Sequence, residues 1–581
     1  MKSLLLTFVF LTSSFGVCQT PFVAPDEKPT FREVKESSLY VPMRDGVRIA
    51  IDVLLPKELR ADQTVPTIFK FSSFGRAAAD GSVSDEDRFW VQHGFARVLM
   101  DERGTGASFG TSCYGPAMIP DLYDIVDWVV KQPWSNGRVG AIGISVEGNA
   151  AELLAATNHP AVRAVAPWFS DWNYYTDLVR PGGLFNEWIL KNFEEFTLRQ
   201  DSGASAKDVD GDTNGLLMRH AIAEHRNNLN IYSSEKAAPF IDDRVGETGK
   251  DLLGLSVAGA ASLIRESRVP MLIFSSWYDA GTAQGTIQRY QTLTNAQQVY
   301  VGAWSHGGNY NADPFSIDGP VEPDHRQRRL EALAFFDRYL KGESSQGGLE
   351  RRFHYYVVGA DQWRSTDVWP PRGLQKATYH LNPKGTLDLS SAGGKRKIRL
   401  QPTSTGKENR WRTQLGGGTI DYNAVLPEMR RLSSFVTAPL RTNIELTGQP
   451  ILRLRIACSQ ENDPSIIAYL LAIDPDGRAS YLTEGHLRIL QRKLNGAQQT
   501  LHGYLRVDAL PLAKWQEIEA DMTLLPISVL IKKDARLQVV LTSGDNATFA
   551  SVGGFKAVIF SASTLELPTY DSSLSFTTGE K

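Results

Sequence analysis

The chain has 581 residues, of which 42% are hydrophobic, 22% charged and 10% aromatic, values that exclude a disordered, collagenous or coiled-coil protein. This length is enough for several hydrophobic cores. Lys and Arg number 62 against 65 Asp and Glu, a net charge of -3, so the composition argues against nucleic acid as a partner.

The first residues have the layout of a secretory signal peptide. Lys2 precedes an apolar run, Leu4–Leu11, and small and polar residues follow up to Cys18. The run is too short to span a bilayer, which takes about 20 apolar residues, and no later segment resembles a membrane span. We expect cleavage after residue 18 and an exported protein, periplasmic or secreted. The alternative is a lipid anchor on Cys18, which bulky Val17 disfavours.

The other two cysteines, Cys113 and Cys458, belong to no C-x-x-C pair. The sequence therefore predicts neither a disulfide framework nor a zinc ribbon. Whether these two cysteines pair with each other stays open.

From about residue 37 to 340, short β-branched apolar runs alternate with helical patterns, which is typical of a mostly parallel sheet covered by helices. One helical pattern, Leu122–Val129, follows Asp121, which we expect to be its N-cap. The expected strands are Val47–Leu55, Thr67–Phe71, Ala96–Met100, Val139–Ile144, Val162–Pro167, Met271–Phe274 and Val299–Gly302.

The alternation breaks between residues 178 and 261, a stretch too long for a simple connection, so we expect a helical cap that forms a lid. Beyond residue 342, short strand-like runs between Gly, Pro, Asn and Asp indicate an all-β domain, a sandwich. The expected domains are an α/β domain (37–177 and 262–345), the cap (178–261) and the β domain (350–581), with strands at Phe353–Val358, Ala377–Leu381, Ile451–Ala457, Ile466–Ile473, Gln538–Leu541 and Val558–Phe560.

Ser145 lies where an apolar strand passes into a helix, within Gly140–Ala150 (GAIGISVEGNA). Such a Gly-x-Ser turn exposes a serine hydroxyl at the carboxyl edge of a sheet, and its glycines let the strand and helix backbones approach closely. Alone the pattern is weak, because a serine at a strand end can simply cap the next helix.

Two further residues complete the order Ser, Asp, His of an α/β-hydrolase. Asp279 follows the apolar strand Val269–Phe274, and His306 ends the next strand and loop. A serine hydroxyl needs a neutral histidine to accept its proton, and the imidazole needs a carboxylate to fix its tautomer. We therefore predict Ser145 as nucleophile, His306 as general base and Asp279 as the orienting acid.

Several longer motifs point to one family. They are Asp101–Gly110 (DERGTGASFG), Trp128 with Gln132–Gly140 (QPWSNGRVG), Trp277–Asp279 (WYD), Gly302–Gly307 (GAWSHG), Phe335–Gly342 (FFDRYLKG), Gly359–Trp363 (GADQW) and Asp474–Arg478 (DPDGR). Over nearly its whole mature length the chain resembles the Xaa-Pro dipeptidyl-peptidase-like hydrolases, the peptidase S15 or cocaine-esterase (CocE/NonD) type. The resemblance implies an α/β-hydrolase core with a helical cap insertion, a C-terminal jelly-roll β-sandwich, an acyl-enzyme, and no metal or organic cofactor.

The chain departs from the family's pattern at the oxyanion hole. Val146 replaces the usual tyrosine after the nucleophile, although its backbone N–H is still a donor. The resemblance also implies a tyrosine hydroxyl from a turn after an early strand, where this chain has Phe74. Losing one oxyanion donor typically costs about 100- to 1000-fold in turnover. Either Ser73 or Ser72 replaces the hydroxyl, or backbone donors suffice and Phe74 is an apolar wall.

The sequence says less about the substrate. Relatives that recognise a free α-amino group carry acidic residues soon after the triad acid, whereas Ala280–Ala283 follow it here. The acidic residues Glu147, Glu187, Glu194 and Glu195 are candidates by position only, because most such side chains are solvated. The expected pocket residues are Glu147, Trp168, Phe185, Trp188, Trp277 and Tyr278, with Phe169, Phe193 and Phe196 as further candidates for a pocket or a core.

The sequence therefore predicts an exported serine hydrolase that cleaves an ester or amide bond of a small-molecule or short-peptide acyl substrate, as a monomer or homo-oligomer. One alternative is a true Xaa-Pro dipeptidyl aminopeptidase that requires a free substrate amine. The other is a non-catalytic binding protein on the same fold. Only Phe74 supports this last alternative, and the intact set of Ser145, Asp279 and His306 argues against it.

Overall fold

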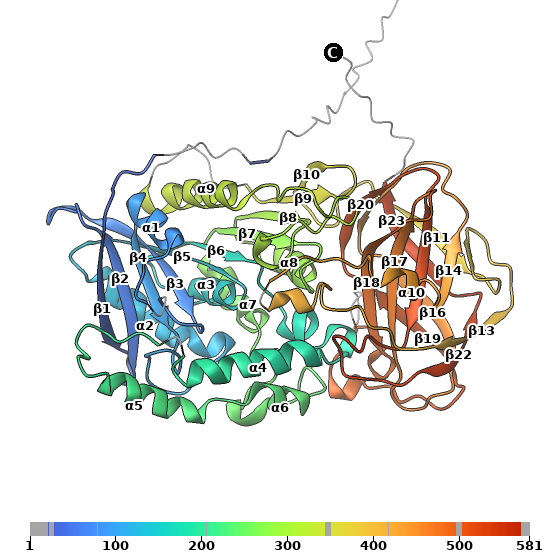
Figure 1. The fold of residues 1–581 in the computed structure, drawn as a ribbon, viewed down its shortest axis with the longest axis horizontal. Coiled ribbons are helices and arrows are strands. Elements are labelled where there is room, and N and C mark those ends of the chain that lie inside the picture. Colours follow the sequence, from blue (N-terminus) through green and yellow to red (C-terminus); the bar gives the residue numbers. More distant parts are fainter. Residues whose placement is uncertain are drawn as a thin grey trace, which may run out of the picture.

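The computed structural model describes residues 21–22, 28–77, 80–204, 206–342, 350–415, 417–495 and 502–570. The predicted signal peptide and Cys18 lie outside the described residues. Along the longest axis, an α/β half occupies one end and an all-β half the other (Figure 1). The predicted fold class, an α/β core followed by an all-β domain, is confirmed.

The α/β half is built on a ten-stranded sheet within the described ranges, in the order β1-β2-β4-β3-β5-β6-β7-β8-β9-β10. Neighbouring strands from β4 to β9 in this order are parallel, so their carboxyl ends meet at one edge. The strands are β1 (Val34–Pro42), β2 (Arg48–Pro56), β3 (Val65–Ser72), β4 (Ala96–Asp101), β5 (Ser135–Ile144), β6 (Val162–Trp168), β7 (Met271–Ser276), β8 (Gln297–Gly302), β9 (Arg352–Val357) and β10 (Gln362–Thr366).

Helices cover this sheet, and the one predicted after Asp121 begins earlier than expected. Its N-cap is Met118, and Pro120 in the first turn favours that start because proline is pre-organised for it. Asp121 lies inside the first turn, where it pairs with Arg103 at 2.6 Å, so its predicted capping role is wrong. The helices are α1 (Asp85–Gln92), α2 (Ile119–Val130), α3 (Val146–Ala156), α7 (Ala261–Ser267), α8 (Thr282–Thr292) and α9 (His325–Phe336).

Between β6 and β7 the chain forms helices α4 (Glu187–Asp201), α5 (Leu216–Glu224) and α6 (Ile231–Lys236). They lie along one side of the α/β half (Figure 1). The side chain of Asn186 accepts the N–H of Ile189 and caps α4. Among the described residues, no helix combines the length and hydropathy that a membrane span requires.

The all-β half contains one continuous sheet of thirteen strands in the described ranges. Strand β17 is buried at every position, so it is covered on both faces. The elements are β11 (Gln375–Leu381), β12 (Thr386–Asp388), β13 (Lys395–Leu400), α10 (Leu426–Met429), β14 (Ser433–Thr437), β15 (Ile444–Gly448), β16 (Ile451–Cys458), β17 (Ser465–Ile473), β18 (Ala479–Arg488), β19 (Glu517–Thr523), β20 (Ile527–Ile531), β21 (Arg536–Thr542), β22 (Phe555–Phe560) and β23 (Thr564–Tyr570).

The run Phe353–Val358, predicted as the first strand of the β domain, belongs to the other sheet. It forms β9, which pairs in parallel with β8 and antiparallel with β10. An alternating pattern specifies which face of a strand is buried but not which strand lies beside it. The sequence of β9 therefore does not predict which of the two sheets this strand joins.

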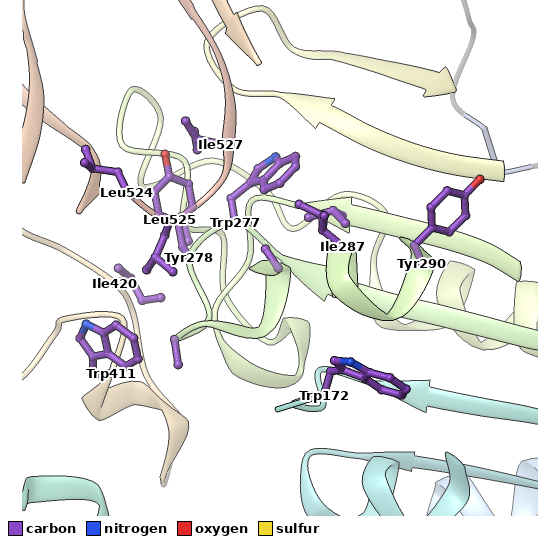
Figure 2. Close-up of a cluster of buried hydrophobic side chains, with 14 of the residues drawn as sticks. Trp172, Trp277, Tyr278, Ile287, Tyr290, Trp411, Ile420, Leu524, Leu525 and Ile527 are labelled. Carbon is purple, nitrogen blue, oxygen red and sulfur yellow. The ribbon is translucent and has the colours of Figure 1, made fainter. Parts of the chain in front are cut away.

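The two halves share a buried apolar cluster (Figure 2). Trp277 and Tyr278 come from the loop after β7, and Ile420, Leu524 and Leu525 come from the all-β half. All five side chains are buried, so the halves are joined by a continuous core rather than by a linker alone.

The cap also touches the all-β half. Gly182, with φ of 58°, approaches β18 so closely that a Cβ there would lie 2.0 Å from the carbonyl oxygen of His486. Close by, Gln491 donates its side-chain amide to the hydroxyl of Tyr175 at 2.8 Å. The start of the cap and the residues just before it are therefore in contact with the all-β half.

Candidate active site

Ser145 occupies the sharp turn between β5 and α3. Its φ of 63° and ψ of −131° are costly for a residue with a side chain, and its N–H donates to Trp168 O at 2.9 Å. Gly143 permits the turn, because a Cβ there would lie 2.3 Å from the carbonyl oxygen of Glu147. The turn brings Ser145 to the carboxyl edge of the sheet, where it lines a cavity.

Asp279 and His306 lie in the loops after β7 and β8. His306 Nδ1 is 3.0 Å from both carboxylate oxygens of Asp279, which is fully buried. Burial by itself lowers the pKa of His306, but the charge and hydrogen bond of Asp279, with the charge of Asp171, outweigh burial and hold this pKa above its usual range. Because Nδ1 is occupied by Asp279, Nε2 is the nitrogen that can accept a proton.

Ser145 and His306 line the same cavity, which has a volume of about 470 Å³, a size typical of a small-molecule site. In the described structure their side chains make no hydrogen bond to each other. Such contacts are often long before substrate binds and tighten afterwards. The fold thus brings together the three residues that the sequence predicts as a triad.

Asp279 has two further partners that sequence reasoning missed. Gln414 of the all-β half donates its side-chain amide to Oδ1, and the Thr282 hydroxyl lies 3.4 Å from Oδ2. Gln414 is 135 residues from Asp279 in the chain, and no motif surrounds it. Only the docking of the two halves reveals this contact.

The cavity combines apolar walls with carboxylic acids. Its lining residues in the described chain include neither Lys nor Arg, although Lys70 lies 3.5 Å from one of the acids, Glu147. The apolar wall from the cap includes Ile189, Leu190, Phe193, Phe196, Leu229 and Ile231, and the acids are Glu102, Glu147, Asp171, Asp177, Asp201 and Glu235.

Two of these acids are buried with little compensating charge. Burial raises the pKa of Glu102 to about 8, and the charges of Glu147 and Asp101 add to the shift. Burial likewise raises the pKa of Glu235 to about 8. Within the described residues Glu102 Oε1 and Asp171 Oδ2 make no hydrogen bond, and no group of three or more His, Cys, Asp or Glu side chains could hold a metal ion.

Phe74 packs its ring edge-on against two cap residues, Phe193 and Phe196, with centroid distances of 6.3 and 5.0 Å. Beside it, Ser73 lines the cavity, and its buried hydroxyl makes no hydrogen bond within the described chain. The Ser72 hydroxyl instead accepts the N–H of Phe74 at 3.1 Å. Ser73 is therefore the better placed of the two serines to donate a hydrogen bond into the cavity.

Other expected pocket residues lie outside the cavity. Of the predicted set, Glu147 lines it, together with Phe169, Phe193 and Phe196. Among the other acidic candidates, Glu187 and Glu194 bind Tyr232 of the cap instead. A large aromatic side chain can be buried equally well in a hydrophobic core as in a pocket wall, and the sequence does not distinguish the two. The pocket prediction is therefore wrong for five aromatic residues that pack in hydrophobic clusters, Trp168, Phe185, Trp188, Trp277 and Tyr278.

Cys113 and Cys458 are both free thiols. Cys113 lines the cavity, and burial raises its pKa to about 12, so it stays a thiol at neutral pH. Its environment does not activate it as a competing nucleophile.

A family model described as X-Pro dipeptidyl-peptidase (S15 family) matches residues 45–308, and one described as the X-Pro dipeptidyl-peptidase C-terminal non-catalytic domain matches residues 348–554. A Mycobacterium bovis protein named as a serine esterase is 31% identical, covering 92% of this chain and 94% of its own. The cocaine esterase of a Rhodococcus species is 24% identical, covering 79% of this chain and 83% of its own. The solved structure of a CocE/NonD family hydrolase from Staphylococcus aureus shares the fold, with a TM-score of 0.69 at 17% identity over 93% of this chain and 94% of its own.

Glu102→Gln should stabilise the protein in a pH-dependent way. The folded-state pKa of Glu102 is about 8 against an ordinary value of 4.5, so the folded state keeps a proton that the unfolded chain releases as pH rises. The stabilisation that this retained proton gives the wild type is gradually lost between about pH 4.5 and 8. The glutamine variant has no proton to lose at this position, so its stability does not change in this way. In thermal denaturation, the Tm gain of Glu102→Gln over wild type should therefore be larger at pH 8.5 than at pH 5.

The control is Glu408→Gln, which changes an exposed carboxylate of the all-β half. The difference in Tm between Glu408→Gln and wild type should be nearly the same at pH 5 and at pH 8.5. An equal Tm change for Glu102→Gln at pH 5 and pH 8.5 would contradict the buried, protonated state of Glu102.

Proposed function

The chain belongs to the X-Pro dipeptidyl-peptidase (S15) family and is a hydrolase of the serine-esterase type, and from this we propose that it cleaves an ester or amide bond of a small, partly apolar acyl substrate through an acyl-enzyme on Ser145. One observation carries the proposal. The 3.0 Å hydrogen bonds between His306 and Asp279 lie at the wall of the same apolar cavity as the strained Ser145 turn.

In the proposed reaction, Ser145 Oγ attacks the carbonyl carbon while His306 Nε2 takes the hydroxyl proton. The tetrahedral intermediate then collapses, the bond to the leaving group breaks, and the imidazolium gives its proton to the departing alcohol or amine. Water next attacks the acyl carbon with His306 again as base, which releases the acid and restores the serine hydroxyl. Asp279 stays ionised and stabilises the imidazolium throughout.

The proposed oxyanion hole uses the backbone N–H of Val146 as its first donor. Val146 is the first residue of α3, and the first N–H groups of a helix have no partner within it and favour a negative charge. For the second donor we propose the Ser73 hydroxyl or a backbone N–H of the Phe74 turn. The unpartnered, buried state of the Ser73 hydroxyl supports the first of these.

A fluorophosphonate probe tests the proposal, because such probes react only with a serine whose neighbours raise its nucleophilicity. We expect labelling of the wild type at Ser145, none of Ser145→Ala, and a large loss for His306→Ala. Thr197→Ala, which alters a cap hydroxyl on the cavity wall, is the control and should label like wild type. Absence of labelling in correctly folded wild type would refute the nucleophile and favour a binding role for the cavity.

Activity should fall as pH drops, because protonated His306 cannot accept the serine proton. Asp279 raises the pKa of this histidine, so the midpoint of the acid limb of kcat/KM should lie above about 6.5, the ordinary histidine value. Asp279→Asn removes that charge and should move the midpoint to lower pH while lowering kcat. The measurement is kcat/KM for a p-nitrophenyl ester from pH 5 to 9. A flat wild-type profile from pH 5 to 8 would exclude His306 as the base.

A dipeptidyl aminopeptidase that requires a free substrate amine is the second candidate. Two observations favour it: carboxylic acids line the cavity, and its lining residues in the described chain include neither Lys nor Arg. A bound ammonium group would supply the charge that Glu235 or Glu102 needs in order to ionise.

Xaa-Pro amides and acyl esters, each with a free and an N-acetylated amine, separate the two candidates. If the amine is required, N-acetylation should lower kcat/KM for the Xaa-Pro amide by more than about 100-fold, the loss expected for an uncompensated buried charge. Equal rates with and without the acetyl group identify an esterase without amine recognition.

We also propose that residues 1–18 are a signal peptide and that the mature protein is exported. The support is the order of Lys2, the apolar run Leu4–Leu11 and the small residues before Gln19.

A further inference from the structure

A short segment of the all-β half, Asn409–Leu415, lies against the loop that carries Asp279. Arg410 is fully buried and donates to the carbonyl oxygens of Trp277, at 2.5 Å, and Ala280, at 2.6 and 3.0 Å. In return, the N–H of Ala280 donates to Arg410 O at 3.2 Å. The residues on both sides of Asp279 are thus hydrogen-bonded to another part of the chain.

Ala280 is where the loop needs this support. Its φ of 42° is a left-handed conformation that a residue with a Cβ adopts only when its surroundings enforce it. Arg410 binds the Ala280 carbonyl with two nitrogens, and its planar guanidinium fixes the direction of both contacts. The hydrogen bonds from Arg410 therefore hold the loop around Asp279 in one backbone conformation.

The segment is itself rigid within the all-β half. Asn409 donates its side-chain amide to the hydroxyls of Thr405 and Thr548, both at 2.9 Å. Arg410 also reaches the hydroxyl of Tyr481, which donates to the buried carboxylate of Glu484 at 2.9 Å. Because every member of this network is buried and hydrogen-bonded, the network fixes the position of Asn409–Leu415 relative to the sheet of the all-β half.

Gln414, at the end of this segment, reaches the carboxylate itself. Its Nε2 donates to Asp279 Oδ1, the same oxygen that lies 3.0 Å from His306 Nδ1, and Gln414 also lines the cavity. An amide N–H on a buried carboxylate stabilises its charge and fixes the plane of the carboxyl group. Gln414 thus shares Asp279 with the histidine.

We propose that the C-terminal β domain is part of the catalytic machinery, with Gln414 as a positioning residue that orients Asp279 and sets how strongly Asp279 stabilises the His306 imidazolium. This inference rests on the proposed triad. It departs from the description of the matched C-terminal family model as non-catalytic, because that region here donates a hydrogen bond to the proposed triad acid.

The proposal has a consequence that a purely structural role lacks. Removing the Gln414 donor leaves more of the Asp279 charge to the imidazolium, so the pKa of His306 should rise further and the acid limb of the pH profile should move to higher pH. A substitution that only loosens packing between the halves would lower stability or activity without moving this limb.

The experiment compares Gln414→Met, which keeps the length of the side chain but has no donor, with Gln414→Asn, which withdraws the amide by one methylene. Gln491→Met is the matched control, since Gln491 is also buried in the all-β half and hydrogen-bonded to the α/β half, but at Tyr175, just before the cap. For each full-length variant, the rate of fluorophosphonate labelling and kcat/KM for a p-nitrophenyl ester are measured from pH 5 to 9, with Tm as a check of folding.

We expect both Gln414 variants to lose about 10-fold or more in kcat/KM at pH 8, as is usual for partners of a catalytic or ligating group, and to shift the acid limb upward by about half a pH unit or more. The Gln491→Met profile should keep its wild-type midpoint. An unmoved midpoint in the Gln414 variants, or an equal shift in Gln491→Met, overturns the proposal. If wild type itself is not labelled at Ser145, the proposed triad fails instead, and the two failures are thereby distinguished.

Discussion

The contact between Arg410 and the backbone on either side of Asp279 is the interaction on which the site depends most. A buried guanidinium must be neutralised or hydrogen-bonded at every donor, so Arg410 can lie there only if the all-β half is docked against the loop after β7. Once this loop is held, the carboxylate of Asp279 lies 3.0 Å from Nδ1 of His306, the proposed base. The docking of the two halves therefore positions the proposed triad acid beside the proposed base.

The parallel sheet contributes the second constraint. Strands β5, β7 and β8 end at one edge, so residues far apart in the chain are brought to the same wall of a cavity. The turn at Ser145 stores backbone strain there, and the close approach at Gly143 makes that turn possible. The cap then closes the cavity with the aromatic side chains of Phe193 and Phe196.

The electrostatics of the cavity are dominated by burial, which outweighs the few cations nearby. Carboxyl groups such as Glu102 and Glu235 face an apolar space with neither Lys nor Arg among its lining residues in the described chain, and their pKa rises because water cannot solvate the charged form. His306 has the opposite balance, since the adjacent carboxylate outweighs burial and raises its pKa. Burial therefore favours the neutral form of Glu102 and Glu235, whereas the carboxylate beside His306 favours its protonated form.

Much of this was predictable from sequence because it depends on local patterns. The strand-turn-helix signature around Ser145, the strand ends before Asp279 and His306, and the order of these residues follow from short-range chemistry that the sequence alone determines. Whether Trp277 and Tyr278 line a pocket or a core, which sheet β9 joins, and that Gln414 reaches Asp279 across 135 residues were decided only by the tertiary structure. The physical reason is that the periodicity of apolar residues specifies which face of a strand or helix is buried, whereas the element that covers this face depends on how separate elements dock.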